Sequence, residues 1–311
     1  MQDRLGQLAL GRFRLTGLIG MGGQGMVYTG TDEQTGRPVA VKLARPEKDD
    51  VGQDRRARLE ADLLGRIDSP YLAKLVACGS DEGLGSFCVV EELVPGRTVS
   101  YLLGREGPFA AAEIAVVVSQ AAQGLSALHG AGYILRDLSP GQVMLHRTPA
   151  SGVQVKLIDL GFVRRIGEET GVTDPRYLAG TPGFTAPELA RGMPATPASD
   201  VYSLAALTYQ MAAGAPAFPL LAAEGIVALQ LADAVMPLPP CPRLGACRDA
   251  LWAVLADALS SNPADRPSTP EHLARLVEQA LSAAAGPPSS RRLLLWLAAA
   301  AMLIAAGVLL L

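Results

Sequence analysis

A glycine-rich run near the N-terminus is the feature that most restricts how this 311-residue chain can fold. The pattern G-x-G-x-x-G-x-V is met by Gly20, Met21, Gly22, Gly23, Gln24, Gly25, Met26 and Val27. Glycines let a backbone approach phosphates closely and present its N–H groups. In dinucleotide-binding units a helix follows this spacing, whereas MVYTGTD here is typical of a strand. We therefore expect a strand–turn–strand flap over a nucleotide. A flexible hairpin with a purely structural role is the alternative.

The residues around this run show strand patterns. In RPVAVKLA, the residues Val39, Val41 and Leu43 alternate with Ala40 and Lys42. This period of two places Ala40 and Lys42 on one face of a strand. The run SFCVVEELV is a further apolar strand, and RRARLEADLLGRI has a helical pattern. Residues 10–94 are thus predicted to form a small, strand-rich lobe.

Helical patterns dominate from about residue 98. EIAVVVSQAAQGLSALHG carries one apolar stripe and stops at a glycine, and DVYSLAALTYQMAAG stops at Gly214. STPEHLARLVEQALSAAAG begins with Ser268 and Glu271 at capping-box spacing, with Pro270 suited to the first turn. The predicted fold class is α+β and bilobal, with a larger helical lobe over residues 98–283.

Further motifs follow the glycine-rich run in a fixed order. They are Val39-Ala40-Val41-Lys42, Arg136-Asp137-Leu138, Asp159-Leu160-Gly161 and Ala186-Pro187-Glu188. In motif content, order and spacing, residues 10–283 resemble the eukaryotic-like serine/threonine protein kinases, including those of bacteria. The resemblance implies transfer of the γ-phosphate of ATP to protein hydroxyls, with Mg²⁺ or Mn²⁺ as the metal.

The resemblance also assigns roles to individual residues. Lys42 matches the lysine that holds the α- and β-phosphates, and Glu60 matches its helix partner. Asp137 matches the aspartate that orients the substrate hydroxyl and accepts its proton. Asp159 and Gln142 stand at the metal-binding positions.

The nucleotide itself is expected to contact a larger set of residues. These are Ile19, Gly20, Met21, Gly22, Gly23, Gln24, Gly25, Val27, Ala40, Lys42, Glu60, Glu92, Val94 and Met144. Among them, Val27, Ala40 and Met144 match the apolar residues around an adenine ring, although ordinary core packing explains such residues equally well. The backbone of Glu92 and Val94 matches the segment that bonds the adenine edge. Three further residues match scaffold positions outside the chemistry. Glu188 matches a structural glutamate with Arg266 as its expected ion-pair partner, and Asp200 matches the helix aspartate that holds the catalytic-loop backbone.

The catalytic loop departs from the family pattern at three positions. Leu135 replaces a histidine, Ser139 replaces a lysine, and Gln142 replaces an asparagine. Loss of the lysine removes a preorganised charge, which can cost about 10²–10³ in rate. Magnesium demands tight geometry, so the longer Gln142 bears on the second metal site. Glu91 is a further departure: it occupies the back of the adenine slot and needs a partner such as Lys42, unless the alignment slips by one residue.

The segment from Asp159 to Glu188 contains two candidate autophosphorylation sites, Thr170 and Thr173. Arg136 could pair a phosphate on either one. Unmodified loop threonines are an equally good interpretation. A homodimer is a possible arrangement for autophosphorylation.

The C-terminal residues predict a membrane anchor. After a linker over residues 284–292, the run from 293 to 311 has no charged residue. A helix of this length spans about 28 Å, close to the hydrocarbon core of a bilayer. Arg291 and Arg292 mark the cytoplasmic flank, and no signal peptide precedes the main domain. We expect a single-pass protein of the cell membrane with a cytoplasmic kinase domain; a buried soluble helix is the alternative.

Composition and the motif departures define the rival functions. The net charge of −3 does not favour a nucleic-acid partner, and the four scattered cysteines do not suggest a zinc site. The rival to a protein kinase is a pseudokinase that acts as a signalling scaffold, with or without bound nucleotide. A kinase-fold enzyme acting on small molecules is disfavoured by the long segment that ends in Ala186-Pro187-Glu188.

Overall fold

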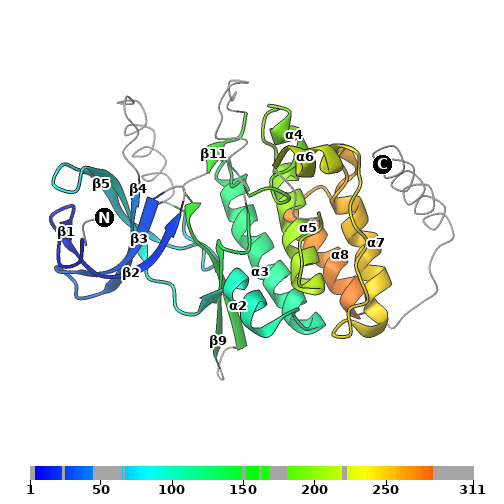
Figure 1. Cartoon of the computed structure of the whole chain (residues 1–311), viewed down its shortest axis with the longest axis horizontal. Coiled ribbons are helices and arrows are strands. Elements are labelled where there is room, and N and C mark those ends of the chain that lie inside the picture. Colours follow the sequence, from blue (N-terminus) through cyan, green and yellow to red (C-terminus); the bar gives the residue numbers. More distant parts are fainter. Residues whose placement is uncertain are drawn as a thin grey trace, which may run out of the picture. The chain divides into compact units, whose positions relative to one another are not determined.

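Alternating apolar residues build the N-terminal strands into one antiparallel sheet, shown in blue to cyan in Figure 1. The computed structural model describes residues 4–22, 25–44, 65, 67–136, 138–148, 152–160, 163–167, 181–218 and 223–282. In the sheet the strand order is β1-β2-β3-β4-β6-β5. The strands are β1 (Leu8–Ala9), β2 (Phe13–Gly22), β3 (Gly25–Asp32), β4 (Pro38–Ala44), β5 (Leu75–Asp81) and β6 (Ser86–Glu92).

One face of this sheet forms a closely packed core. Val39, Val41 and Leu43 on β4 are 1% exposed or less, as the period of two predicts, and pack with Phe13, Leu15, Tyr28, Cys88 and Val90. Ala40 and Lys42 keep partial exposure on the other face. Burial of the apolar face fixes the register, because a slip of one residue would turn every side chain over. The core therefore determines which residues face the candidate site.

Two smaller sheets complete the strand-rich part of the chain. One has the order β10-β9-β7 and the other pairs β11 with β8. Their strands are β7 (Arg97–Thr98), β8 (Tyr133–Ile134), β9 (Val143–Thr148), β10 (Gly152–Leu157) and β11 (Arg164–Arg165). The chain divides into two units: the strand-rich unit comprises residues 1–101, 123–135 and 140–166, and the helical unit comprises residues 102–122, 136–139 and 167–311.

Helix α5 is the buried centre of the helical unit. It contacts α7 and α8, and the three lie side by side in Figure 1. Thr196 caps its start with a reciprocal bond to Ser199, and Gly214 ends it with a left-handed φ of 76°. The helices are α2 (Val99–Glu106), α3 (Ala111–Gly130), α4 (Pro187–Ala190), α5 (Pro197–Ala213), α6 (Ala223–Leu231), α7 (Arg248–Ala258) and α8 (Pro270–Ser282), with short helices η3 (Gly245–Cys247) and η4 (Pro263–Asp265).

The start of α8 corrects one detail of the predicted capping. Ser268 was the expected cap, but the helix begins at Pro270, and Thr269 Oγ1 accepts a hydrogen bond of 3.1 Å from the backbone N–H of His272. Thr269 therefore occupies the capping position. The pattern S-T-P offers two adjacent hydroxyls, and the proline at the first helical position selects the second of them.

Helix α3 is long and apolar enough, by length and composition, to cross a membrane, and among the described residues no other helix is. Its apolar stripe is packed inside the protein, since Ile114, Val117, Val118, Ala121, Leu125 and Leu128 are all 0% exposed. The helix thus has the character of a core helix, as its sequence predicted. The membrane segment predicted at residues 293–311 and the predicted helix that carries Glu60 lie outside the described residues.

Candidate functional site

The glycine-rich run forms the predicted hairpin. Strands β2 and β3 pair so that Gly22 lies opposite Gly25 and Gly20 lies opposite Val27. The φ of Gly25 is 141°, a conformation that side-chain-bearing residues rarely adopt. Because a strand follows the last glycine, the dinucleotide-binding interpretation is excluded. Gly23 and Gln24 lie outside the described residues.

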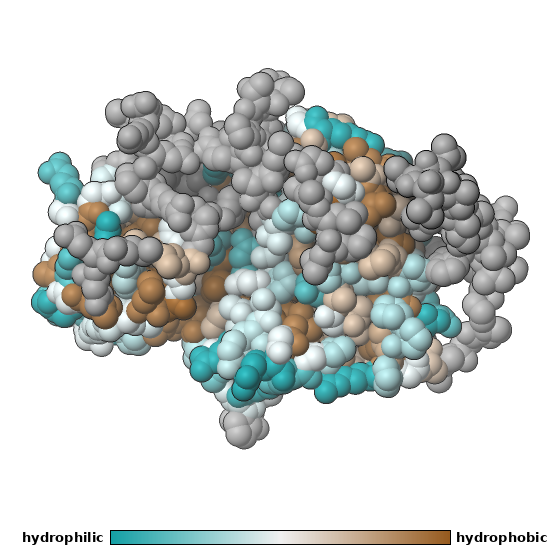
Figure 2. Space-filling view, in the orientation of Figure 1, coloured by the Kyte–Doolittle hydropathy of each residue, from teal (hydrophilic) through white to brown (hydrophobic). Residues whose placement is uncertain are grey.

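The tip of the hairpin presents apolar side chains to solvent. Leu18, Ile19 and Met21 are 53%, 54% and 55% exposed, and Figure 2 shows hydrophobic surface over the strand-rich unit. The β2–β3 register shifts between Leu18 and Gly20, which leaves Ile19 in an irregularity of the pairing. Such irregularities re-aim side chains at functional sites. The hairpin thus carries apolar side chains that the core of its own sheet does not bury.

Lys42 and Asp159 meet within the strand-rich unit. Lys42 Nζ lies 2.5 Å from Asp159 Oδ1, and the two side chains are 19% and 30% exposed. They are 117 positions apart in the sequence, so the fold itself brings them together. Asp159 has a φ of 57°, which is unfavourable for a residue with a side chain. The predicted convergence of these two residues is confirmed, whereas Asp137, the third, lies outside the described residues, as do Glu60, Thr170 and Thr173.

Glu91 lies beside this ion pair. It is directly opposite Ala40 in the β4–β6 pairing, which excludes a slip of one residue and puts its side chain on the face of Ala40 and Lys42. Glu91 Oε2 accepts a hydrogen bond of 3.5 Å from the backbone N–H of Asp159. Lys42, the predicted partner, forms an ion pair with Asp159, and its charge also acts on the Glu91 carboxyl group.

The surroundings of Glu91 favour its protonated form. Burial of the carboxyl group raises the pKa of Glu91 to about 7, and the negative charge of Asp159 adds to the rise. Hydrogen bonds from the backbone N–H groups of Asp159 and Leu160, together with the charge of Lys42, act in the opposite direction. Desolvation is the largest of these causes.

The residues predicted to surround adenine are apolar but incompletely buried. Val27, Ala40 and Met144 keep partial exposure, whereas their strand neighbours Tyr28, Val41, Val143 and Leu145 are at most 4% exposed. Apolar side chains on the open face of a sheet are suited to the flat face of a ring. These three side chains therefore lie outside the fully buried core.

The segment after β6 is held in place at both ends. Glu92 donates its N–H to Lys74 O at 2.9 Å, and its carboxylate pairs with Lys156. Gly96 has a φ of 109°, and a Cβ there would lie 2.2 Å from Leu145 O, so only glycine fits this close approach. Within the described part of the chain, the backbone of Val94 has no hydrogen-bond partner. The Glu92 ion pair was not predicted, because Lys156 belongs to none of the motifs that the sequence shows.

Gln142 lies next to the segment that carries Asp159. It is 7% exposed, and its backbone carbonyl accepts a hydrogen bond of 2.9 Å from the N–H of Ile158. The Asp159 carboxylate and the Gln142 amide both offer oxygen, the donor that magnesium prefers. Among the described residues, no cluster of three or more His, Cys, Asp or Glu side chains could hold a metal by itself. The donor set therefore fits a metal that also depends on phosphate and water oxygens.

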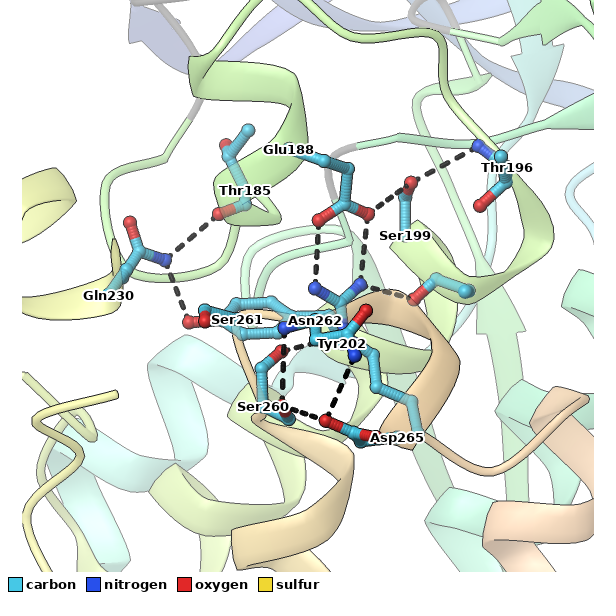
Figure 3. A network of polar contacts seen from close by, with 12 residues as sticks. Thr185, Glu188, Thr196, Ser199, Tyr202, Gln230, Ser260, Ser261, Asn262 and Asp265 are labelled. Atoms are coloured by element: carbon cyan, nitrogen blue, oxygen red, sulfur yellow. Dashed lines mark hydrogen bonds and ion pairs between the residues drawn. The ribbon is translucent and has the colours of Figure 1, made fainter. Parts of the chain in front are cut away.

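A buried polar cluster surrounds Glu188 in the helical unit (Figure 3). Arg266 Nη1 and Nη2 bond the two oxygens of Glu188 at 2.9 and 2.8 Å, and Ser199 Oγ donates to Glu188 Oε1 at 2.7 Å. The Arg266 and Glu188 side chains are 0% and 3% exposed. Despite burial, hydrogen bonds and the charge of Arg266 leave the pKa of Glu188 below its usual value. The predicted Glu188–Arg266 ion pair is confirmed.

Asp200 holds the catalytic loop as predicted. Its Oδ1 accepts a hydrogen bond of 2.7 Å from the backbone N–H of Arg136, within the helical unit. Arg136 has a φ of 75°, a conformation that costs free energy and needs such support. Leu135 is 0% exposed, which is consistent with its expected role as an apolar replacement for histidine.

These features agree with comparisons against known proteins. The protein kinase domain family matches residues 13–277, and the chain belongs to this family. It is 31% identical over 287 residues to the serine/threonine-protein kinase PknD of Mycobacterium tuberculosis, covering 91% of this chain. It is 33% identical over 247 residues to PknA of the same organism, covering 78% of this chain.

A solved structure shares the fold. The crystal structure of the Mycobacterium tuberculosis PknI kinase domain gives a TM-score of 0.64 at 21% identity and covers 88% of this chain and 98% of its own. The protein kinase fold predicted from the motifs is therefore confirmed. The chain spans 42% of PknD and 55% of PknA, so about half the length of these relatives is matched.

Proposed function

We propose that this chain is a membrane-anchored serine/threonine protein kinase that transfers the γ-phosphate of ATP to hydroxyl groups of proteins. The observation that carries the proposal is the Lys42–Asp159 ion pair at 2.5 Å, on the open face of the sheet that bears the glycine flap. A cation on a rigid strand beside a carboxylate on a second segment is the arrangement that phosphoryl transfer requires. Family membership adds support.

In this proposal, Lys42 and Asp159 exchange partners when ATP binds. Their pairing keeps both charges oriented before ATP binds, and their partial exposure leaves them accessible. Lys42 would then bind phosphate oxygens, and Asp159 and Gln142 would hold the metal. A bound divalent metal neutralises charge on the phosphates. The apolar surface of Val27, Ala40 and Met144 takes the adenine, and the backbone of Val94 bonds its edge.

Asp137 is proposed to orient the substrate hydroxyl and accept its proton. Its neighbour Arg136 is tied to Asp200 at 2.7 Å, which fixes the backbone on one side of Asp137. Fixed positioning of a general base is a large part of its effect. Ser139 in place of a lysine predicts a slow enzyme.

Phosphoryl transfer is testable with labelled ATP and the purified chain. With Mg²⁺ or Mn²⁺, we expect autophosphorylation or transfer to a generic protein substrate, and loss of both in Asp137→Asn and Lys42→Met. Absence of transfer by the unmodified chain, with ATP still bound, would contradict the proposal and favour a pseudokinase scaffold. Equal transfer by the two variants would contradict the assigned roles.

The membrane anchor is proposed from the sequence of residues 291–311. The uncharged run and the two arginines before it have the length and charge of a single membrane-spanning helix. We expect the chain to fractionate with membranes and to become soluble when residues 291–311 are deleted. Membrane association that survives the deletion would contradict this proposal.

A further inference from the structure

Glu91 is an unusual residue for the back of an adenine slot, because a carboxylate there needs hydrogen-bond donors. The β4–β6 register places it directly opposite Ala40, on the same face as Lys42. Its own β6 neighbours, Cys88 and Val90, point into the core and are 0% exposed. The side chain of Glu91 is thus directed to the face where Lys42 meets Asp159.

The donors that Glu91 meets belong to the backbone of the metal-binding segment. Its Oε2 accepts the N–H of Asp159 at 3.5 Å, and the N–H of Leu160 also bonds its carboxyl group. Two successive N–H groups directed at one acceptor group form an anion-binding concavity, which requires an unusual backbone conformation. Asp159 supplies this conformation with its φ of 57°.

The left-handed conformation of Asp159 needs this support. A residue with a side chain adopts it only at a cost in free energy. The conformation also decides where the Asp159 carboxylate points, and in this structure it points at Lys42. The hydrogen bonds that Glu91 accepts from the N–H groups of Asp159 and Leu160 act against that cost.

We propose that Glu91 is a positioning residue: it holds the backbone of Asp159 and Leu160 so that the Asp159 carboxylate stays aimed at the metal–phosphate site. This inference rests on the proposed ATP-dependent function. Glu91 contacts neither nucleotide nor metal in this account. Its effect is therefore on metal-dependent binding of the nucleotide, and not on the affinity for the nucleotide alone.

The test compares Glu91→Met, Glu91→Gln and the control Glu82→Met in the full chain. Glu82 is exposed in the β5–β6 turn of the same unit, so its replacement removes a charge without touching the site. The measured quantity is the dissociation constant of a non-hydrolysable ATP analogue with and without Mg²⁺. We expect the Mg²⁺-dependent gain in affinity to be about tenfold smaller in Glu91→Met than in the unmodified chain. The two chains should bind the metal-free analogue with the same affinity.

Rescue by the conservative variant separates positioning from general damage. Glu91→Gln keeps one acceptor oxygen and should recover most of the Mg²⁺-dependent gain, while Glu82→Met should match the unmodified chain. An unchanged gain in Glu91→Met would overturn the inference, as would equal loss with and without metal. If the unmodified chain binds the analogue without any metal dependence, the proposed function fails instead. If Glu91→Met does not fold, Glu91→Ala takes its place. Its Mg²⁺-dependent gain in affinity is then compared with that of Glu91→Gln, and the same outcomes apply.

Discussion

Glu188 and Glu91, two glutamates that are buried or partly buried, differ in their hydrogen-bond partners and in the direction of their pKa shifts. In the helical unit, Glu188 meets a bidentate arginine and a serine hydroxyl, and its pKa lies below the usual value. In the strand-rich unit, Glu91 meets backbone N–H groups, and its pKa rises to about 7. The first carboxylate has its charge matched, whereas the second shares one lysine with Asp159.

The exposure of the two ion pairs differs in the same way. Arg266 and Glu188 are 0% and 3% exposed, and Lys42 and Asp159 are 19% and 30% exposed. A fully satisfied buried pair contributes to a fixed structure, since either partner left alone would be strongly unfavourable. A partly exposed pair can exchange partners at little cost. The charges of the scaffold pair are matched within the protein, whereas we propose that phosphate and metal complete the candidate site.

The largest expected effect separates the two pairs by stability. Arg266→Ala leaves Glu188 buried without its cation and should lower the free energy of unfolding by about 3–5 kcal/mol. Lys42→Met removes a partly exposed partner and should cost about 1 kcal/mol or less. Urea unfolding of both variants measures the difference. Similar losses in the two variants would break the comparison.

The next effect concerns the rate of phosphoryl transfer. If the candidate site lacks a charge that the family normally places there, Ser139→Lys should raise the transfer rate by up to about 10². Ser80→Lys, at an exposed position on β5, adds the same charge elsewhere and serves as the control. A rate that is unchanged by Ser139→Lys, or raised equally by Ser80→Lys, would show that the missing lysine does not limit this enzyme.

The smallest effect is a difference in pH dependence of opposite sign. Because the pKa of Glu188 is lowered in the folded chain, its charge contributes stability at pH values above its usual pKa of 4.5. This stability is lost as pH falls through the folded-state pKa. The Glu91 carboxyl group keeps its proton to about pH 7 in the folded chain but releases it near pH 4.5 in the unfolded chain. The free energy of unfolding therefore declines as pH rises from about 4.5 to about 7. In metal-free unfolding curves, Glu188→Gln should reduce the acid-side loss and Glu91→Gln should flatten the decline. Identical pH profiles for the two variants would contradict the assignment.

The sequence predicted the side-chain pairs that follow family spacing. The ion pair of Glu188 with Arg266 and the Asp200 bond to the Arg136 backbone were both anticipated and are confirmed. So were the alternation on β4 and the buried stripe of α3, because periodicity reports which face is buried.

The partner of Glu91 could not be read from the sequence. It is a backbone N–H, which every residue other than proline carries, and its direction depends on the positive φ of Asp159. Aspartate is enriched in that conformation, but most aspartates do not adopt it, so the residue type at position 159 does not predict it. The Glu92–Lys156 pair was missed for a related reason: both residues lie in ordinary strands, and only the three-dimensional fold brings them together.

The central claim is that Lys42 and Asp159 form one half of a site for the phosphates of ATP. The most direct measurement is the stability of the full chain against ATP with Mg²⁺, compared with Lys42→Met. At about 100 times the dissociation constant, ATP should stabilise the unmodified chain by about 2.7 kcal/mol, and the same concentration should stabilise the variant far less. Equal stabilisation of both chains, or no stabilisation of either, would contradict the claim.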